Sequence, residues 1–263
     1  MKKISRVDLH AHTARCHHAQ GSMEAYVLAA IEAGVTHYGF SDHAPLFWDA
    51  GYRMAAEEMD EYEAEIESLQ KRLGDRIRLL RGYEMDWLPG KMDDRVLERR
   101  VDYRIGSVHF LSGWGFDNPA FIGEYAKRNL DHVWRDYFAA MGEMAASGHF
   151  DIAGHFDLIK VFGHFKDRGA DEAVMQALEA VKENGMAIEI NTAGWRKPVA
   201  EQYPSRAILQ AAFALKIPVT FGSDAHDVCH VAQDLERAYE LARSVGYREA
   251  AWFAERKMQM IKI

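Results

Sequence analysis

Short apolar runs alternate with longer amphipathic stretches along most of the chain. Apolar runs rich in β-branched residues predict buried strands, and seven lie near residues 4–9, 36–41, 77–83, 102–107, 151–154, 186–190 and 217–222. Stretches with helical periodicity lie between them, near residues 22–34, 55–73, 120–147, 170–184, 205–215 and 231–245. This alternation predicts repeated βα units around a parallel sheet.

The helix ends and the length of the chain favour one folding unit. Gly34, Gly148 and Gly185 follow three of the predicted helices, where glycine commonly ends a helix. No low-complexity linker or solenoid repeat interrupts the 263 residues, which suit a single α/β barrel, so we predict one domain over residues 1–263. In a barrel or nearly closed sheet, the chemistry collects at the carboxyl ends of the strands.

Composition and charge restrict the class of protein. Hydrophobic residues make up 48% of the chain and charged residues 27%, which suits a soluble protein with a sizeable core. The net charge of -8 disfavours a nucleic-acid partner, because backbone binding needs clustered Lys and Arg. No apolar run of membrane-spanning length occurs, and the two cysteines, Cys16 and Cys229, form no disulfide framework. We therefore expect a cytoplasmic protein without a membrane partner.

Metal-ligating side chains follow most of the predicted strands. His10 and His12 close the first strand two residues apart, which places both on one face. Five other strands end in an imidazole or a carboxylate: His43, Glu84, His109, His155, Asp224 and His226. A single such histidine is usually an ordinary polar residue, but recurrence at one topological place indicates a shared site. Imidazole and carboxylate are ligands that Zn, Mn and Fe accept, and His18 lies in a loop beside the first strand.

Several of these segments resemble motifs of the polymerase-and-histidinol-phosphatase (PHP) superfamily. The general motifs are residues 8–13, the His18 loop, and residues 41–45, 106–109 and 222–226. Three further segments resemble the histidinol-phosphate phosphatase branch: residues 154–160, 191–198 and 203–205. The resemblance covers residue 7 to about residue 226. It implies an α/β fold, a distorted barrel of seven βα units, with a metal site at the carboxyl ends of the strands.

The resemblance also implies a ligand set for three divalent transition metals (Zn, Fe or Mn). One metal would be held by His10, His12, Glu84 and Asp224. Glu84 would bridge to a second metal, which His109 and His155 also hold. The third metal would be held by His18, His43 and His226. Every one of these positions is filled in this sequence.

The activity that the resemblance implies is hydrolysis of L-histidinol phosphate to L-histidinol and phosphate, in histidine biosynthesis. The charge of such a site agrees with an anionic substrate. Three divalent ions contribute about +6, and Glu84 with Asp224 remove two charges, which leaves about +4. A metal-bound hydroxide, available because the water pKa falls towards about 7, would attack phosphorus in line.

Three residues are candidates for phosphate binding and proton transfer. We expect Arg196 and Lys160 to contact the phosphate, since a guanidinium fork and an ammonium suit its oxygens. The alternative for each is a solvated surface cation. His230, close to His226, is a candidate proton donor to the leaving alkoxide, or it faces solvent.

Other polar residues have weaker claims. Asp8 shares a strand face with His10 and is expected to accept its ring N–H or to be a plain strand-end carboxylate, and Asp42 and Asp157 allow the same reading. Asp117 is a candidate contact for the amino or imidazole group of the substrate, or an ordinary turn residue. We expect a buried neutral thiol at Cys16 and a solvated acidic face on the helix near residues 55–73. Structural or surface roles are expected for His17, His37, His132, His149 and His164.

Other functions remain open at this point. Another phosphoesterase of the superfamily, such as a nucleotide phosphatase or a small exonuclease, would use the same ligands. A non-catalytic metal-binding module and a metal-dependent amidohydrolase are further alternatives, although no lysine is placed to be a carbamylated bridging ligand. The identity of the metals, the exact substrate, the general acid and the oligomeric state are not predicted.

Overall fold

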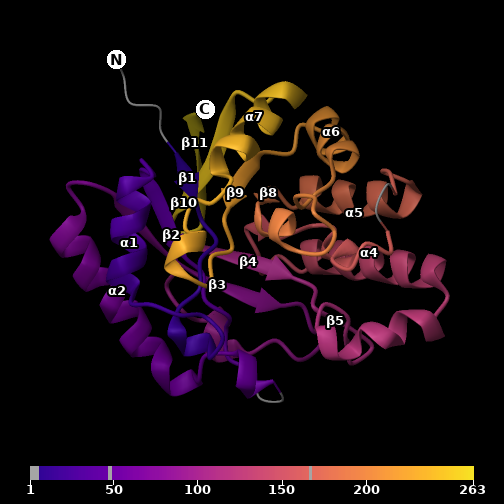
Figure 1. Ribbon diagram of the computed structural model, residues 1–263, viewed down its shortest axis with the longest axis horizontal. Helices are drawn as coiled ribbons and strands as arrows, with labels where there is room; N and C mark the ends of the chain where they lie inside the picture. The colour runs from indigo at the N-terminus through magenta and orange to yellow at the C-terminus, as the bar shows by residue number, and fades with distance from the viewer. Residues whose placement is uncertain (1–5, 47–48, 166–167) are drawn as a thin grey trace.

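Seven parallel strands form the central sheet of the computed structural model, which describes residues 6–46, 49–165 and 168–263 (Figure 1). The strand order is β1-β2-β3-β4-β7-β8-β9, and every neighbouring pair is parallel. Their bounds are Val7–Asp8 (β1), His37–Phe40 (β2), Arg78–Asp86 (β3), Tyr103–Ser107 (β4), Ile152–Ala153 (β7), Ala187–Asn191 (β8) and Val219–Gly222 (β9). The seven predicted strands coincide with these, except that residues 4 and 5 of the first lie outside the described residues.

The two outer strands of this sheet approach each other. The backbone N–H of Leu9, just after β1, donates to the carbonyl of Phe221 in β9 at 2.8 Å. Ala11 forms a parallel bridge to Ala225, and the N–H of His12 also donates to Ala225. The sheet therefore curls into a nearly closed barrel, which confirms the predicted distorted barrel.

Helices surround the barrel and bury one face each against it (Figure 1). Their bounds are Met23–Glu32 (α1), Met59–Leu73 (α2), Asp94–Leu97 (α3), Leu130–Ala146 (α4), Glu172–Glu183 (α5), Arg206–Ala214 (α6) and Leu235–Val245 (α7). Short 3₁₀ helices lie at Ala14–Cys16, Ala50–Tyr52, Ala56–Glu58, Pro119–Lys127, Leu158–Lys160, Ala193–Arg196 and Val228–His230. In α7 the buried residues follow helical spacing: Leu235, Ala238, Tyr239 and Ala242. Within the described ranges, no helix combines the length and apolar character needed to cross a bilayer.

Two predicted helices differ from the structure. The stretch near 120–147 is a 3₁₀ helix followed by α4, because the side chain of Asn129 accepts the N–H of His132 at 3.0 Å and starts a new helix there. The helix near 231–245 begins only at Leu235, since the N–H of Ala232 donates to the buried carboxylate of Asp8 at 3.2 Å instead of entering a helix.

The C-terminal segment forms an antiparallel hairpin that the sequence pattern did not predict, β10 (Glu249–Ala254) and β11 (Lys257–Lys262). It packs against the first residues of several barrel strands. Trp252 contacts His37 at the start of β2, and Phe253 contacts Tyr103 at the start of β4. The carbonyl of Ala251 accepts the hydroxyl of Thr220 in β9 at 2.8 Å. The hairpin thus covers the amino-terminal end of the barrel and leaves the carboxyl end for the site.

The side chain of Tyr103 fills the barrel interior on the side away from the carboxyl ends of the strands. Its hydroxyl donates to the carbonyl of Leu9 at 2.6 Å, across the barrel from β4 to the end of β1. The ring fits only because β2 and β3 carry glycine beside it. A Cβ at Gly39 would lie 2.0 Å from the Tyr103 hydroxyl, and one at Gly82 would lie 2.6 Å from its ring. The interior is therefore packed beneath the site.

Candidate metal centre

The predicted ligands gather at the carboxyl ends of the barrel strands. The loop after β1 supplies His10 and His12, and His43 follows β2, where it bridges to Glu84 of β3. The loops after β4, β7 and β9 supply the remaining strand-end ligands: His109, His155, Asp224 and His226. His18 follows the 3₁₀ helix Ala14–Cys16, which ends at His17 with a left-handed φ of 65°. Strands far apart in the sequence therefore meet at one place.

The candidate ligand atoms form groups tight enough to hold ions. In each group the donor atoms lie within 4.8 Å of one another. Three of the groups correspond to the three predicted positions: His10 with His12 and Asp224, Glu84 with His109 and His155, and His18 with His43 and His226. A further group joins His12, His43 and Glu84. All nine predicted ligands belong to at least one group.

Glu84 lies at the centre of these groups. Its Oε1 is 2.8 Å from Nε2 of His155 and 3.6 Å from Nε2 of His109. Its Oε2 is 2.8 Å from Nδ1 of His43, and 3.5 and 3.6 Å from the Nε2 atoms of His10 and His12. One carboxylate therefore faces five imidazoles from four loops, which suits a bridging ligand.

The chemistry of the inward-facing atoms fits metal ions. Nε2 of His10, Nε2 of His12 and Oε2 of Glu84 are buried and have no hydrogen-bond partner among the described residues. A buried polar atom without a partner costs about 1 to 3 kcal/mol, so three converging ones need a common explanation. Imidazole nitrogens and carboxylate oxygens are the donors that divalent transition metals take.

The outward-facing ring nitrogens are held by carboxylates. Nδ1 of His109 is 2.7 Å from Oδ1 of Asp86, and Nδ1 of His12 is 3.3 Å from Oδ1 of Asp42. Nδ1 of His10 is 2.8 Å from Oε1 of Glu189. A carboxylate behind a ligating imidazole fixes the tautomer in which Nε2 offers its lone pair inward. This arrangement recurs at three of the histidines.

Asp8 does not hold the ring of His10, so the first of its two expected roles is wrong. Its Oδ1 accepts the N–H of Ser223 at 2.8 Å, and its Oδ2 accepts that of Ala232. Asp8 therefore fixes the backbone that leads to Asp224, and burial raises its pKa to about 6. The carboxylate behind His10 is Glu189, which the sequence analysis missed. Its one sequence signal is an acid inside the apolar strand β8.

The electrostatics of the centre keep its carboxylates ionised. Burial alone would raise the pKa of Glu84, but the imidazoles of His43 and His10 hold it well below its usual range. The pKa of Asp224 is also held well below its usual value, against the effect of burial, chiefly by His10 and His12. Both candidate ligands are therefore anionic at neutral pH.

Arg196 lies beside the ligand Asp224. It ends the 3₁₀ helix Ala193–Arg196, and its Nη2 donates to the carbonyl of Ser223 at 2.7 Å. Its Nη1 is buried without a partner in the described part of the chain, so one face of the guanidinium is free to donate. His230 is partly buried on the loop after β9, and burial together with Arg196 lowers its pKa.

Lys160 is not a solvated cation. Its side chain is 2% exposed, and Nζ lies 2.9 Å from Asp157, 2.6 Å from Glu201 and 2.8 Å from the carbonyl of Gln202. Three partners match the three donors of an ammonium. A direct contact with phosphate therefore requires that one of these partners be replaced. Asp157 also accepts the N–H of Ser205, so the cluster joins two loops.

Cys16 is buried next to the centre. Its thiol donates to the carbonyl of Thr13 at 3.1 Å, and Sγ belongs to a group with His12 and His226. Burial would raise the pKa of this thiol, but hydrogen bonds with His12 and His18 lower it. Arg15, next to Cys16, forms an ion pair with Glu65 of α2 at 2.9 Å, which fixes this loop to the helix.

The acidic face of α2 is largely exposed, as expected, but some of its carboxylates also hold the helix in place. Glu63 lies 3.5 Å from Arg81 and accepts the hydroxyl of Tyr83 at 2.9 Å. Together with the pair that Arg15 forms with Glu65, these contacts dock the helix onto β3 and the His18 loop. Glu63 and Glu65 therefore anchor α2, whereas Asp60, Glu61 and Glu67 are exposed.

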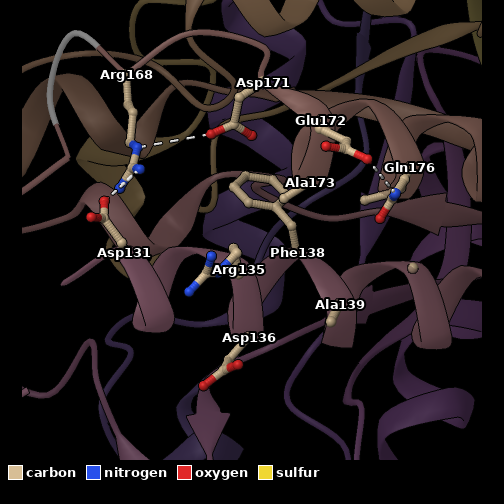
Figure 2. Close-up of a pocket in the computed structure, with 12 residues that line it drawn as sticks. Asp131, Arg135, Asp136, Phe138, Ala139, Arg168, Asp171, Glu172, Ala173 and Gln176 are labelled. Atoms are coloured by element: carbon tan, nitrogen blue, oxygen red, sulfur yellow. Dashed lines mark hydrogen bonds and ion pairs between the residues drawn. The ribbon is translucent and has the colours of Figure 1, made fainter. Parts of the chain in front are cut away.

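A groove of about 790 Å³ lies between α4 and α5, and its lining holds none of the candidate metal groups of the described residues (Figure 2). Arg168 lies between Asp131 and Asp171, at 2.7 and 3.9 Å (Figure 2). No candidate metal group and no buried titratable cluster lines this groove among the described residues, so the histidine centre is the better candidate for chemistry.

Comparison with known proteins agrees with this geometry. Residues 8–193 match the PHP domain family. A protein of Deinococcus radiodurans named "Probable histidinol-phosphatase" is 43% identical over 257 residues, which cover 96% of this chain and 98% of that protein. The histidinol-phosphatase of Bacillus subtilis is 29% identical over 269 residues, which cover 90% of this chain and 98% of that protein.

A solved structure shares the fold. Histidinol phosphate phosphatase from Lactococcus lactis, in complex with Zn, L-histidinol and phosphate, superposes with a TM-score of 0.82 at 22% identity, covering 98% of this chain and 99% of that one. The likeness extends over the barrel and its surrounding helices. The PHP match covers far more than half of the chain, and a relative 43% identical matches nearly all of it, so the chain belongs to the PHP family.

Proposed function

We propose that this protein hydrolyses L-histidinol phosphate to L-histidinol and phosphate with a centre of three divalent metals. The observation that carries the proposal is the position of Glu84, within 3.6 Å of imidazole nitrogens from five histidines. The names of the relatives from Deinococcus radiodurans and Bacillus subtilis support histidinol phosphate as the substrate. The complex from Lactococcus lactis supports zinc as one metal that such a barrel holds.

The three groups of ligand atoms support the assignment of the metals. His10, His12 and Asp224 with Glu84 would hold one metal, His109 and His155 with Glu84 would hold the second, and His18, His43 and His226 would hold the third. When bound, the metals supply Lewis-acid stabilisation of the phosphoryl oxygens and lower the pKa of the attacking water. The side chains for the second position are buried, whereas His18 of the third position is exposed to solvent.

The protein groups around the centre have distinct roles in the proposal. Arg196 binds a non-bridging phosphate oxygen through its free Nη1. Lys160 contacts the phosphate only if it exchanges Glu201 for it, and otherwise fixes the loops that surround the substrate. His230 donates a proton to the leaving alkoxide. Burial and the neighbouring Arg196 lower the pKa of His230, and a bound phosphate dianion would act in the opposite direction.

The setting of the enzyme is part of the same proposal. The buried residues form a connected core that includes residues of all seven barrel strands, which supports one domain over residues 1–263. Cys16 and Cys229 are both free thiols, which supports a reducing, cytoplasmic location.

The test is phosphate release by the purified protein after chelation and reconstitution with Zn, Mn or Fe. We expect turnover of L-histidinol phosphate to exceed that of p-nitrophenyl phosphate and of a nucleoside 3′-monophosphate by at least about 10²-fold in kcat/KM. Equal turnover of all three would overturn the substrate and leave the phosphatase class. A reconstituted protein that releases no phosphate would overturn the class as well.

A further inference from the structure

Glu189 is a buried carboxylate whose two oxygens serve two different metal positions. It lies in β8, inside the barrel and 1% exposed. Oε1 is 2.8 Å from Nδ1 of His10, and Oε2 accepts the backbone N–H of His155 at 2.8 Å. His10 belongs to the group with Asp224, whereas His155 belongs to the group with His109. One side chain therefore reaches ligands of two ions.

Each contact fixes a different property of its ligand. The bond to Nδ1 of His10 sets the tautomer, so that Nε2 presents a lone pair inward. The bond to His155 fixes the backbone, which has a positive φ of 20° there and is unfavourable for a residue with a side chain. Without the carboxylate, His10 can rotate or change tautomer and the backbone of His155 can relax.

The surroundings leave Glu189 little freedom. A Cβ on Gly222 of β9 would lie 2.0 Å from Oε1 of Glu189 and 2.5 Å from Cβ of His10. Only glycine at this place allows the carboxylate and the imidazole to approach each other. Asn191 donates from Nδ2 to Oε2 of Glu189 at 3.1 Å and to Oδ2 of Asp224 at 3.3 Å, which extends the network to a third ligand.

We propose that Glu189 is a positioning residue that couples the loading of the two metal positions that share Glu84. The proposal rests on the metal assignment above, but not on the identity of the substrate. Because one rigid carboxylate orients His10 and anchors His155, an ion at one position holds Glu189 in the geometry that the other position needs. Loss of Glu189 should therefore weaken both positions together.

Glutamine is the most informative substitution for Glu189. Its amide has one acceptor oxygen and one donor NH₂. In either orientation the NH₂ faces a donor, the N–H of His155 or the N–H of His10, so Glu189→Gln must lose one of the two contacts. Gly222→Ala disturbs the same contact while the carboxylate is kept. Asp86→Asn is the matched comparison, since His109 is the one candidate ligand that Asp86 contacts, and its other carboxylate oxygen pairs with Arg53. Glu183→Gln, at the exposed end of α5, is the surface control.

The experiment measures metal content by elemental analysis after equilibration of each Mn-loaded variant with a graded series of chelators. Electron paramagnetic resonance then distinguishes exchange-coupled Mn pairs from isolated Mn ions. Wild type and Glu183→Gln should lose the pair in one step. Glu189→Gln should lose both ions at about 10- to 100-fold lower chelator strength. Asp86→Asn should lose the ion at His109 first, so that its Mn content falls by one ion per chain before the ion at His10 is removed.

The outcomes separate this proposal from the proposed function. A wild type that binds no metal overturns both. If the wild type loads normally and Glu189→Gln retains its pair of ions equally well, the coupling alone is overturned. The same holds if Glu189→Gln loses only one ion. Thermal unfolding of the metal-free forms provides the folding control. If the metal-free Glu189→Gln variant is not folded under the assay conditions, the same measurement is made on Gly222→Ala. A folded Gly222→Ala variant that keeps its pair of ions overturns the coupling.

Discussion

Nη2 of Arg196 lies 2.7 Å from the carbonyl oxygen of Ser223, the residue just before the ligand Asp224. This bond orients the guanidinium beside the metals and leaves Nη1 without a partner in the described chain. We expect Arg196→Ala to lower kcat/KM by about 10²-fold, because a charged donor to the phosphoryl oxygens is lost. Steady-state phosphate release measures this effect.

Metal content provides the control for that prediction. Arg196→Ala should retain the metal content of the wild type, and Arg196→Lys should recover only part of the activity because a single ammonium cannot reproduce both donors. A fall in bound metal that matches the fall in activity would mean that Arg196 supports Asp224 rather than the substrate.

Glu84→Gln tests the centre itself. An amide cannot bridge two cations as a carboxylate does, so we expect loss of metal from two positions and a fall in kcat of about 10³-fold or more. Elemental analysis and kinetics measure the two effects, and Glu98→Gln on the surface is the control. A Glu84→Gln variant with full metal content would contradict the bridging role.

Lys160→Met tests whether this lysine is chiefly structural. Its removal leaves Asp157 and Glu201 without their buried cation, so the free energy of unfolding should fall by about 3 kcal/mol. Urea unfolding measures the change, and adding Glu201→Gln should restore part of it. If stability is unchanged while KM for histidinol phosphate rises steeply, the ammonium acts on the phosphate instead.

The buried carboxyl of Asp8 gives a pH dependence with a definite sign. Burial raises its pKa from the usual 3.8 to about 6. Between these values the folded protein binds more protons than the unfolded chain, so the stability that Asp8 contributes is full below pH 3.8 and is lost as the pH rises through about 6. In metal-free protein, wild type should lose about 2 to 3 kcal/mol relative to Asp8→Asn across this window. The free energy of unfolding of both proteins is measured with urea across this pH range. A difference between them that does not change with pH would show that Asp8 does not titrate there.

The C-terminal hairpin should matter for stability and not for chemistry. Phe253 is 2% exposed and packs on Tyr103 beneath the barrel. Phe253→Ala should lower the free energy of unfolding by about 3 kcal/mol, with KM and metal content unchanged. A changed KM at normal stability would mean that the packing beneath the barrel reaches the site.

The ligand positions were predictable because they recur at one place in a repeating pattern. His10, His43 and His109 each lie two or three residues after the end of a strand, so the order of strands alone brings them together. Their supporting carboxylates obey no such local rule. Glu189 is 179 positions away from His10, and only the closure of the barrel brings the two into contact. The nearer candidate, Asp8, is turned towards the backbone of Ser223 instead.

The remaining misses also have physical causes. The hairpin turn consists of Glu255 and Arg256, both with positive φ, where Asn or Gly would have signalled a two-residue turn. Its strands gain their stability from contacts with the barrel rather than from their own composition. The burial of Lys160 could not be read from its motif, because Glu201 approaches it from another loop.

The hairpin at the amino-terminal end of the barrel offers a place to attach a label or a support. Because β10 and β11 cover the amino-terminal end, a fluorophore or a support attached through the exposed Met260 would lie at the opposite end of the barrel from the metals. The same arrangement allows the hairpin to be redesigned for thermal robustness without touching the strand ends that hold the ions. Immobilisation of the enzyme through the hairpin should therefore leave the carboxyl end of the barrel open to substrate.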